Sequence, residues 1–219
     1  MIRKTTSKGK WTYVYDTENR LISIGYAPGL KIAKPIANYY YDGDGGRVKK
    51  IVYRYQDLDY SNSETYGFLA AQTGAPTFTT NTQTSVATVY VGNLYEIEDS
   101  ANGNPQRRAK SLFLGSTRIA SITGSDIAYY HQDHLGSTNV MSDKTGLARS
   151  LTEYDPFGKI SRFEKFGSKL PSGWQYFHDK PFDDESGLSF FGGRYYDSKL
   201  GRFITADTIV QAPDNPQTL

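Results

Sequence analysis

The sequence predicts an all-β protein, and its composition and an internal repeat are the reasons. It holds 18 tyrosines and 11 phenylalanines but only 2 methionines and 2 tryptophans, and aromatic residues of this kind favour strands. Its 21 glycines favour turns. A strand, turn, strand pattern also occurs twice near the start. The 219 residues, 37% of them hydrophobic, are enough for one large or two small folded domains.

The first copy of the repeat is a hairpin that begins near Tyr13. Tyr13 and Tyr15 share one face by the alternation of a strand, and residues 16–19 supply turn-forming side chains. Ile22 and Ile24 are expected to share a face on the returning strand. The second copy has the same design, with a strand ending at Tyr41, a glycine-rich turn over residues 42–46 and a return strand over residues 47–53.

Short strands broken at glycine follow over residues 88–97 and 110–120. The stretch 60–85 differs, because it is rich in Thr, Ser, Gly and Ala and has weak periodicity. We expect an insertion loop near 60–85, with one short helix over residues 66–72.

The charge pattern excludes a dedicated nucleic-acid binder. The formal net charge is only +2, whereas such a protein neutralises many phosphates along a basic face. The basic runs 47–50 and 107–110 lie beside turn residues, so we expect solvated loops there.

Redox, metal and membrane functions also find little support. The chain has no cysteine, hence no disulfide and no thiolate ligand. His131, Asp133 and His134 lie close in sequence and are a weak candidate for a metal site in a chain without cysteine, so we expect no metal and no cofactor. The first residues lack the apolar region of a signal peptide, and no stretch approaches the roughly 20 apolar residues of a spanning helix. We therefore expect no membrane insertion.

The second half carries ordered motifs. His-Leu-Gly-Ser-Thr begins at His134 and Tyr-Asp-Pro-Phe-Gly at Tyr154, and Arg-Tyr-Tyr-Asp at Arg194 is followed closely by Leu-Gly-Arg-Phe-Ile. In this order they resemble the Rhs repeat-associated core, and the Tyr-Asp hairpins before them resemble YD repeats. The resemblance covers roughly residues 10–207 and divides the chain into YD-repeat hairpins over 1–125, the core over 126–207 and an extended tail over 208–219.

This resemblance implies consecutive YD-repeat β-hairpins that form a spiralling sheet strip, part of a hollow shell. Such shells occur in bacterial Rhs polymorphic toxins, in the C components of insecticidal toxin complexes and in animal teneurins, and in the toxins they hold a C-terminal effector. It also implies structural roles for the motif residues Tyr15, Asp16, Tyr41, Asp42, His134, Gly136, Tyr154, Asp155, Gly158, Arg194, Tyr196, Asp197, Gly201 and Arg202.

The resemblance further implies an aspartyl self-cleavage site, in which Asp207 matches the first of two aspartates. Two carboxylates that share a proton can activate water against a peptide bond, whereas one cannot. Thr208 stands where proline is common, and Asp214 lies in a segment that resembles a loop more than the second motif. In this chain alone we expect Asp207 to cap a turn or form an ion pair, and we expect no complete catalytic site.

Two functional hypotheses remain. In the first, the chain is a section of a shell that encloses or presents an effector protein. We expect that protein to be secreted, displayed at the cell surface or delivered as a bacterial toxin, through a route that this chain does not encode. Alternatively, it is an adhesive or self-assembling module of the cell surface that pairs with protein partners or other copies through its strand edges.

Overall fold

The computed structural model describes residues 2–6, 9–28, 33–55, 83–100, 105–166 and 176–206. These residues form strands and turns, which confirms the predicted all-β class. No helix occurs among them, and so none that could span a membrane.

Most strands belong to one sheet of 13 strands, the main sheet. In chain order they are β1 (Ile2–Thr6), β2 (Gly9–Tyr15), β3 (Leu21–Pro28), β4 (Lys34–Tyr41), β5 (Arg47–Tyr55), β6 (Gln83–Val91), β7 (Tyr95–Ser100), β8 (Pro105–Leu114), β9 (Thr117–Thr123), β10 (Asp126–Gln132), β11 (Thr138–Asp143), β12 (Ala148–Tyr154) and β13 (Ile160–Lys165).

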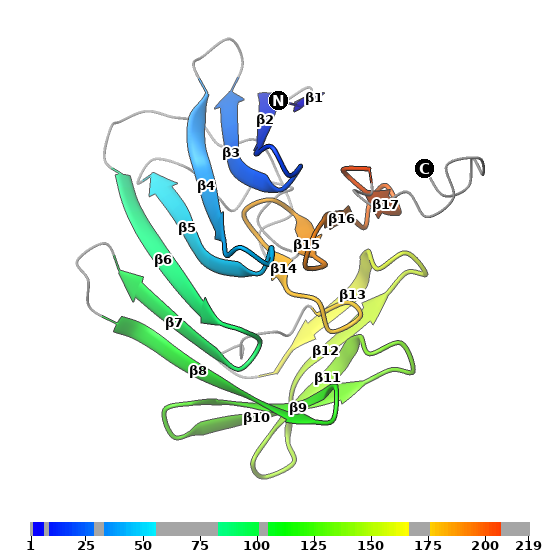
Figure 1. Ribbon diagram of the computed structural model, residues 1–219. Helices are drawn as coiled ribbons and strands as arrows, with labels where there is room; N and C mark the ends of the chain where they lie inside the picture. The colour runs from blue at the N-terminus through cyan, green and yellow to red at the C-terminus, as the bar shows by residue number, and fades with distance from the viewer. Residues whose placement is uncertain are drawn as a thin grey trace.

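Each strand of the main sheet pairs antiparallel with the next strand along the chain. Figure 1 shows that the resulting strip curves strongly, so that it has a concave inner face. Sheets twist because of backbone sterics, and bulges increase the local bend. The predicted strip of consecutive hairpins is therefore confirmed.

A single turn design recurs along this strip. In the turns that begin at Asp16, Asp42, Asp133 and Asp143, one aspartate oxygen accepts hydrogen bonds from the backbone N–H groups two and four residues later. The turn at Asp155 closes through the same pair of backbone hydrogen bonds as the others. A β-bulge follows each turn, opposite the residue that precedes the aspartate.

These bulges correct one expectation. Tyr15 pairs with Leu21 and Val14 with Ser23, so Ile22 is the extra residue and the alternation shifts by one. Leu21 and Ile24 enter the hydrophobic core, whereas Ile22 does not. The prediction that Ile22 and Ile24 share a face is wrong for this reason.

The predicted insertion loop ends before residue 85, earlier in the sequence than expected. Strand β6 begins at Gln83 and pairs with β5 without a bulge, so residues 83–85 are part of the sheet. The rest of that loop, and the helix predicted over residues 66–72, lie outside the described residues.

A second sheet follows the main sheet in the chain. The C-terminal sheet consists of β14 (Phe182–Asp183), β15 (Leu188–Phe190), β16 (Tyr195–Asp197) and β17 (Arg202–Phe203), again antiparallel in chain order. Figure 1 shows it inside the curve of the main sheet. The main sheet itself continues across residues 125 and 126 through the β9–β10 hairpin, and the proposed domain division at that point stays a prediction.

Candidate functional site

The C-terminal sheet packs against the inner face of the first hairpins. Its buried residues Leu188, Phe190 and Tyr195 join one hydrophobic cluster with residues of β2, β3 and β4. The members from the main sheet are Trp11, Tyr13, Leu21, Ile24, Tyr26, Ile36, Ala37 and Tyr39. The C-terminal sheet and the first hairpins therefore form one core.

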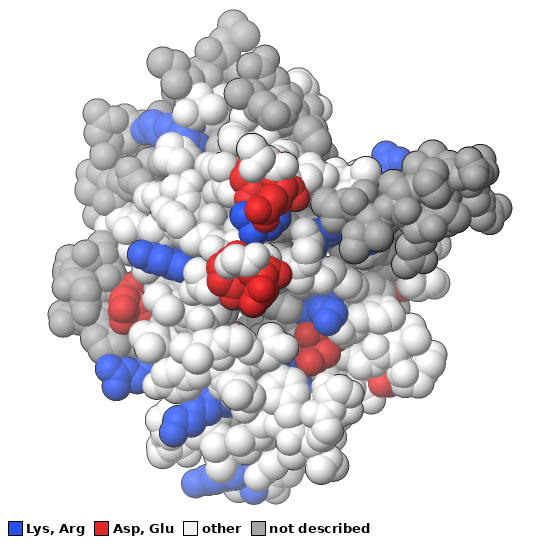
Figure 2. All heavy atoms as spheres, viewed as in Figure 1, with Lys and Arg blue, Asp and Glu red and all other residues white. Residues whose placement is uncertain are grey.

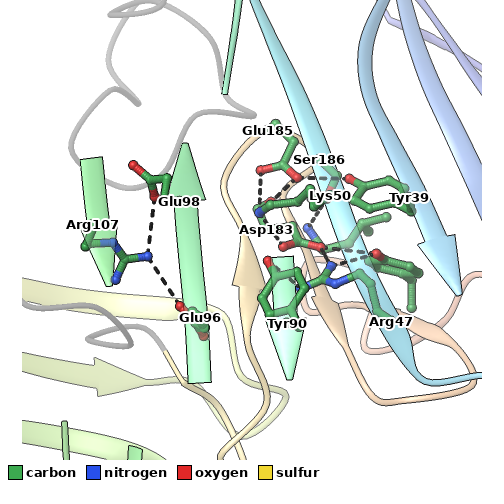
Figure 3. Close-up of polar contacts among 12 residues, drawn as sticks. Tyr39, Arg47, Lys50, Tyr90, Glu96, Glu98, Arg107, Asp183, Glu185 and Ser186 are labelled. Carbon is green, nitrogen blue, oxygen red and sulfur yellow. Dashed lines mark hydrogen bonds and ion pairs between the residues drawn. The ribbon is translucent and has the colours of Figure 1, made fainter. Parts of the chain in front are cut away.

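Four charged side chains lie at this contact, and we call them the buried charge cluster: Arg47 and Lys50 from β5, Asp183 from β14, and Glu185 from the turn after it. Arg47 donates from Nη1 to Oδ2 of Asp183. The Nζ of Lys50 lies 2.8 Å from Oδ1 of Asp183 and 3.2 Å from Oε1 of Glu185. Figure 3 shows that β5 and the C-terminal sheet supply opposite charges to the cluster.

Tyrosine hydroxyls complete the cluster. Tyr39 donates to Oε1 of Glu185 at 3.1 Å, and Tyr195 donates to Oδ2 of Asp183 at 3.2 Å. The guanidinium of Arg47 lies over aromatic rings, 4.6 Å from the centroid of Phe190 and 4.8 Å from that of Tyr90. Cation–π contacts of this kind partly replace lost hydration.

The pKa values of the two buried carboxyl groups shift in opposite directions. The side chains of Asp183 and Glu185 are only 1% and 4% exposed. Burial pushes the pKa of Asp183 upward, but Arg47 and Lys50 outweigh this and hold it below its ordinary value. Burial raises the pKa of Glu185, with Asp183 adding to the effect and Lys50 opposing it. Because protein side chains cover both carboxylates, the cluster joins two parts of the chain.

The expectation of solvated loops at the basic runs is wrong. Residues 47–50 lie in β5 and residues 107–110 in β8. The bulge at Val48 places both Arg47 and Lys50 toward the C-terminal sheet, while Arg107 lies 3.3 Å from carboxylate oxygens of both Glu96 and Glu98. Sequence reasoning missed Asp183 and Glu185 altogether, since nothing local pairs them with β5.

A second contact region lies between residues 176–180 and the hairpins β9–β13. Arg118 donates from Nε to Oδ1 of Asp179 at 2.9 Å, and the backbone N–H of Thr138 donates to the carbonyl of Tyr176 at 2.8 Å. Gly158 is pressed against Phe177, because a Cβ at that glycine would lie 2.4 Å from Cδ1 of the ring. The C-terminal segment thus contacts early and late hairpins of the main sheet.

The motif residues of the hairpins lie in or beside the recurring turns. Asp16 and Asp42 accept the turn hydrogen bonds, and Tyr15 and Tyr41 pack against the hydrophobic cluster. Tyr154 packs against Phe177. Asp155 and Gly158 lie in the turn that follows β12, and His134 and Gly136 lie in the turn after β10. These positions agree with structural roles, which stay predictions.

The motif residues of the core lie in the C-terminal sheet. Tyr196 donates from its hydroxyl to the carbonyl of Phe157 at 3.0 Å, and Asp197 accepts from the backbone N–H of Lys199 at 2.9 Å. Arg194 lies 4.0 Å from the ring centroid of Phe203. Gly201 adopts a φ of 66° in the turn before β17, and Arg202 is exposed.

Asp207 and Asp214 lie outside the described residues. The last described residue, Ala206, accepts a hydrogen bond at 3.5 Å from Nδ2 of Asn19 in the β2–β3 turn. Figure 2 shows that acidic side chains gather in the region where the β2–β3 and β4–β5 turns meet the C-terminal sheet.

The histidine and acidic residues predicted not to bind metal make different contacts. Nε2 of His131 lies 2.8 Å from the hydroxyl of Ser142, Asp133 caps its turn, and His134 is exposed. Within the described ranges no group of three or more His, Cys, Asp or Glu side chains could hold a metal ion.

A pocket of about 270 Å³ lies along the seam between the main sheet and the C-terminal segment. Arg47, Arg118 and Lys180 line it together with Asp42, Glu96 and Asp179, so its charges are balanced. Aromatic residues of both parts, including Tyr90 and Phe190, complete the lining.

Comparison with known proteins adds a family. A family model described as the teneurin YD-shell matches residues 105–219, more than half of the chain. The chain is 24% identical over 203 residues to the tRNA3(Ser)-specific nuclease WapA of Bacillus spizizenii, and the alignment covers 92% of this chain and 7% of that protein. It is 26% identical over 181 residues to toxin subunit YenC1 of Yersinia entomophaga, covering 74% of this chain and 18% of that one.

The fold also matches solved structures. The crystal structure of TcdB2-TccC3 without its hypervariable C-terminal region aligns with a TM-score of 0.66 at 19% identity, over 93% of this chain and 9% of that chain. At this identity the likeness establishes the fold alone. The chain spans less than a fifth of the length of each of these proteins.

Proposed function

Because the chain belongs to the teneurin YD-shell family, we propose that it is a section of an Rhs-type toxin shell that encloses a C-terminal effector polypeptide. In this proposal the main sheet is the wall of the shell, and the C-terminal sheet closes over its inner face. Proteins of this kind would be secreted or displayed at the cell surface, by a route encoded outside this chain.

One observation carries the proposal. After thirteen consecutive strands the chain turns back, and its C-terminal sheet docks inside the curve of the strip that it has just built. A repeat strip alone would continue outward, since each hairpin needs only its neighbours. An inward return of the chain suits a section that ends a shell and holds the following segment inside it.

The docking also supports a role for Asp207 in self-cleavage. Asn19 donates from Nδ2 to the carbonyl of Ala206, one residue before Asp207, at 3.5 Å. A carboxylate at position 207 could share a proton with a second aspartate and activate water against a peptide bond. We propose that the parent protein supplies that second aspartate.

The test is the intact mass of the product of the full natural gene, for the wild type, for Asp207→Asn and for the control Asp44→Asn, which changes an exposed turn carboxylate. We expect two fragments from the wild type and from Asp44→Asn, and one uncut chain from Asp207→Asn. Cleavage that persists in Asp207→Asn would refute the catalytic role, and a natural product no larger than this chain would refute the enclosure of an effector.

A second function is favoured by the edges of the strip. Among the described residues, β1 and β13 each pair with a strand on one side only, and open edges can add strands from other chains. An adhesive or self-assembling module would use them. Light scattering of the purified chain over a range of concentrations separates the two functions. A module that assembles forms larger species as its concentration rises, whereas the shell function does not require the chain to associate with other copies.

A further inference from the structure

The buried charge cluster has an uneven distribution of partners between its two carboxylates. Asp183 contacts both cations, Arg47 and Lys50, and also accepts from the hydroxyl of Tyr195. Glu185 contacts Lys50 at 3.2 Å and the hydroxyl of Tyr39 at 3.1 Å, and its carboxyl group also has a hydrogen bond to its own backbone. The stronger partners therefore belong to Asp183, and Glu185 is the carboxylate that accepts a proton more readily.

The surroundings of Glu185 allow it to be neutral. Tyr39 on β4 stays protonated because burial raises the pKa of its hydroxyl well above the ordinary value. At the observed separation from Oε1, that hydroxyl can donate to a carboxylate or accept from a carboxyl O–H. The other charged or titratable groups of the cluster are Lys50 and Arg47 on β5, Asp183 on β14, Tyr195 on β16 and, beside Arg47, Tyr90 on β6.

We propose that Asp183 and Glu185 form a one-proton site, so that docking of the C-terminal sheet onto the main sheet is accompanied by proton uptake at Glu185. The site is buried only when the two sheets are in contact, because its cations come from β5 and its carboxylates from the C-terminal sheet. Docking and protonation are therefore linked.

The direction of the linkage follows from the two carboxyl groups. Burial raises the pKa of Glu185, so docking gains stability as the pH falls through that raised value, and the gain is complete below the ordinary glutamate value of about 4.3. The lowered pKa of Asp183 gives stability that is present above the ordinary aspartate value of about 3.9 and is lost below it. Above about pH 3.9, where the contribution of Asp183 is present, the C-terminal sheet is therefore held more firmly in mild acid than at neutral pH.

This inference goes beyond the proposed shell function and does not depend on cleavage or on what the shell encloses. It implies that mild acid retains the C-terminal sheet and that rising pH loosens it. A shell with this property would stay closed in an acidic compartment.

The first measurement is a carbon-13 NMR titration of the Glu185 side-chain carboxyl in the full wild-type chain. We expect its midpoint to lie above the ordinary glutamate value. A midpoint at or below that value would overturn the proposal, and no variant is needed to decide it.

The second measurement is hydrogen exchange of the segment that contains β14 to β16, from the ordinary glutamate value of about pH 4.3 up to about pH 8, corrected for the intrinsic rate. In the wild type we expect protection to rise as the pH falls, by at most about tenfold per pH unit for one proton. Glu185→Gln should remove this dependence, and Asp44→Asn, which changes an exposed carboxylate outside the cluster, should keep it. An unchanged dependence in Glu185→Gln would also overturn the proposal.

Discussion

At the scale of single residues, burial rather than sequence context decides what a charge does. Arg47 lies beside a glycine-rich turn and looks like a solvated residue, yet its side chain is 2% exposed. A buried ion costs several kcal/mol in lost hydration unless partners compensate it. Asp183 and the surrounding rings provide that compensation, which makes the pair sensitive to the loss of either member.

The buried carboxylate gives the first prediction. Asp183→Ala should lower the free energy of unfolding by roughly 3–5 kcal/mol, because it leaves Arg47 and Lys50 buried without their main partner. Urea unfolding followed by circular dichroism measures this. Asp44→Ala, at an exposed position outside the cluster, should change stability by no more than about 0.5 kcal/mol. Equal effects of the two changes would show that the cluster does not stabilise the fold.

At the scale of elements, one turn design explains the regular strip. The aspartate after the last residue of a strand bonds the backbone of its own turn, a residue in the left-handed region closes that turn, and a bulge follows. Gly45 has this conformation with φ 81°, and Asn19 has it in the first turn with φ 62°. The same local chemistry therefore sets the register of each such hairpin.

The turn beginning at Asp42 supplies a matched pair for the second prediction. Asp42→Ala removes two hydrogen bonds to backbone N–H groups and should cost about 1–2 kcal/mol. Asp44→Ala, in the same turn, removes no described side-chain hydrogen bond and should cost less than about 0.5 kcal/mol. Thermal unfolding of both variants tests this, and a larger loss in Asp44→Ala would contradict the turn mechanism.

At the scale of the whole molecule, the C-terminal sheet covers the apolar inner face of the first hairpins. Tyr26, Ile24, Ile36 and Tyr39 are each at most 2% exposed in its presence. Without that cover, much of their apolar surface would meet water, which favours aggregation. The strip and its C-terminal sheet should thus fold as one unit.

Truncation tests this third expectation. A chain that ends after Phe166 should bind a hydrophobic dye, aggregate and lose cooperative unfolding, because the cluster shared with Leu188, Phe190 and Tyr195 is gone. A chain that ends after Ala206 keeps every contact described above and should melt cooperatively within a few degrees of the full chain. A soluble, cooperative product of the shorter chain would show that the main sheet is stable alone.

The sequence by itself determined the all-β class, the hairpins, the aspartate turns and the family resemblance, because each depends on short-range alternation and turn chemistry. It did not determine where bulges shift the alternation, as at Ile22 and Val48, since bulges arise from pairing with the neighbouring strand. Only the tertiary structure decided that Arg47 of β5 forms an ion pair with Asp183 of β14, which lies 136 residues later in the sequence. Such a pair leaves no periodic signal, because curvature of the whole strip brings its members together.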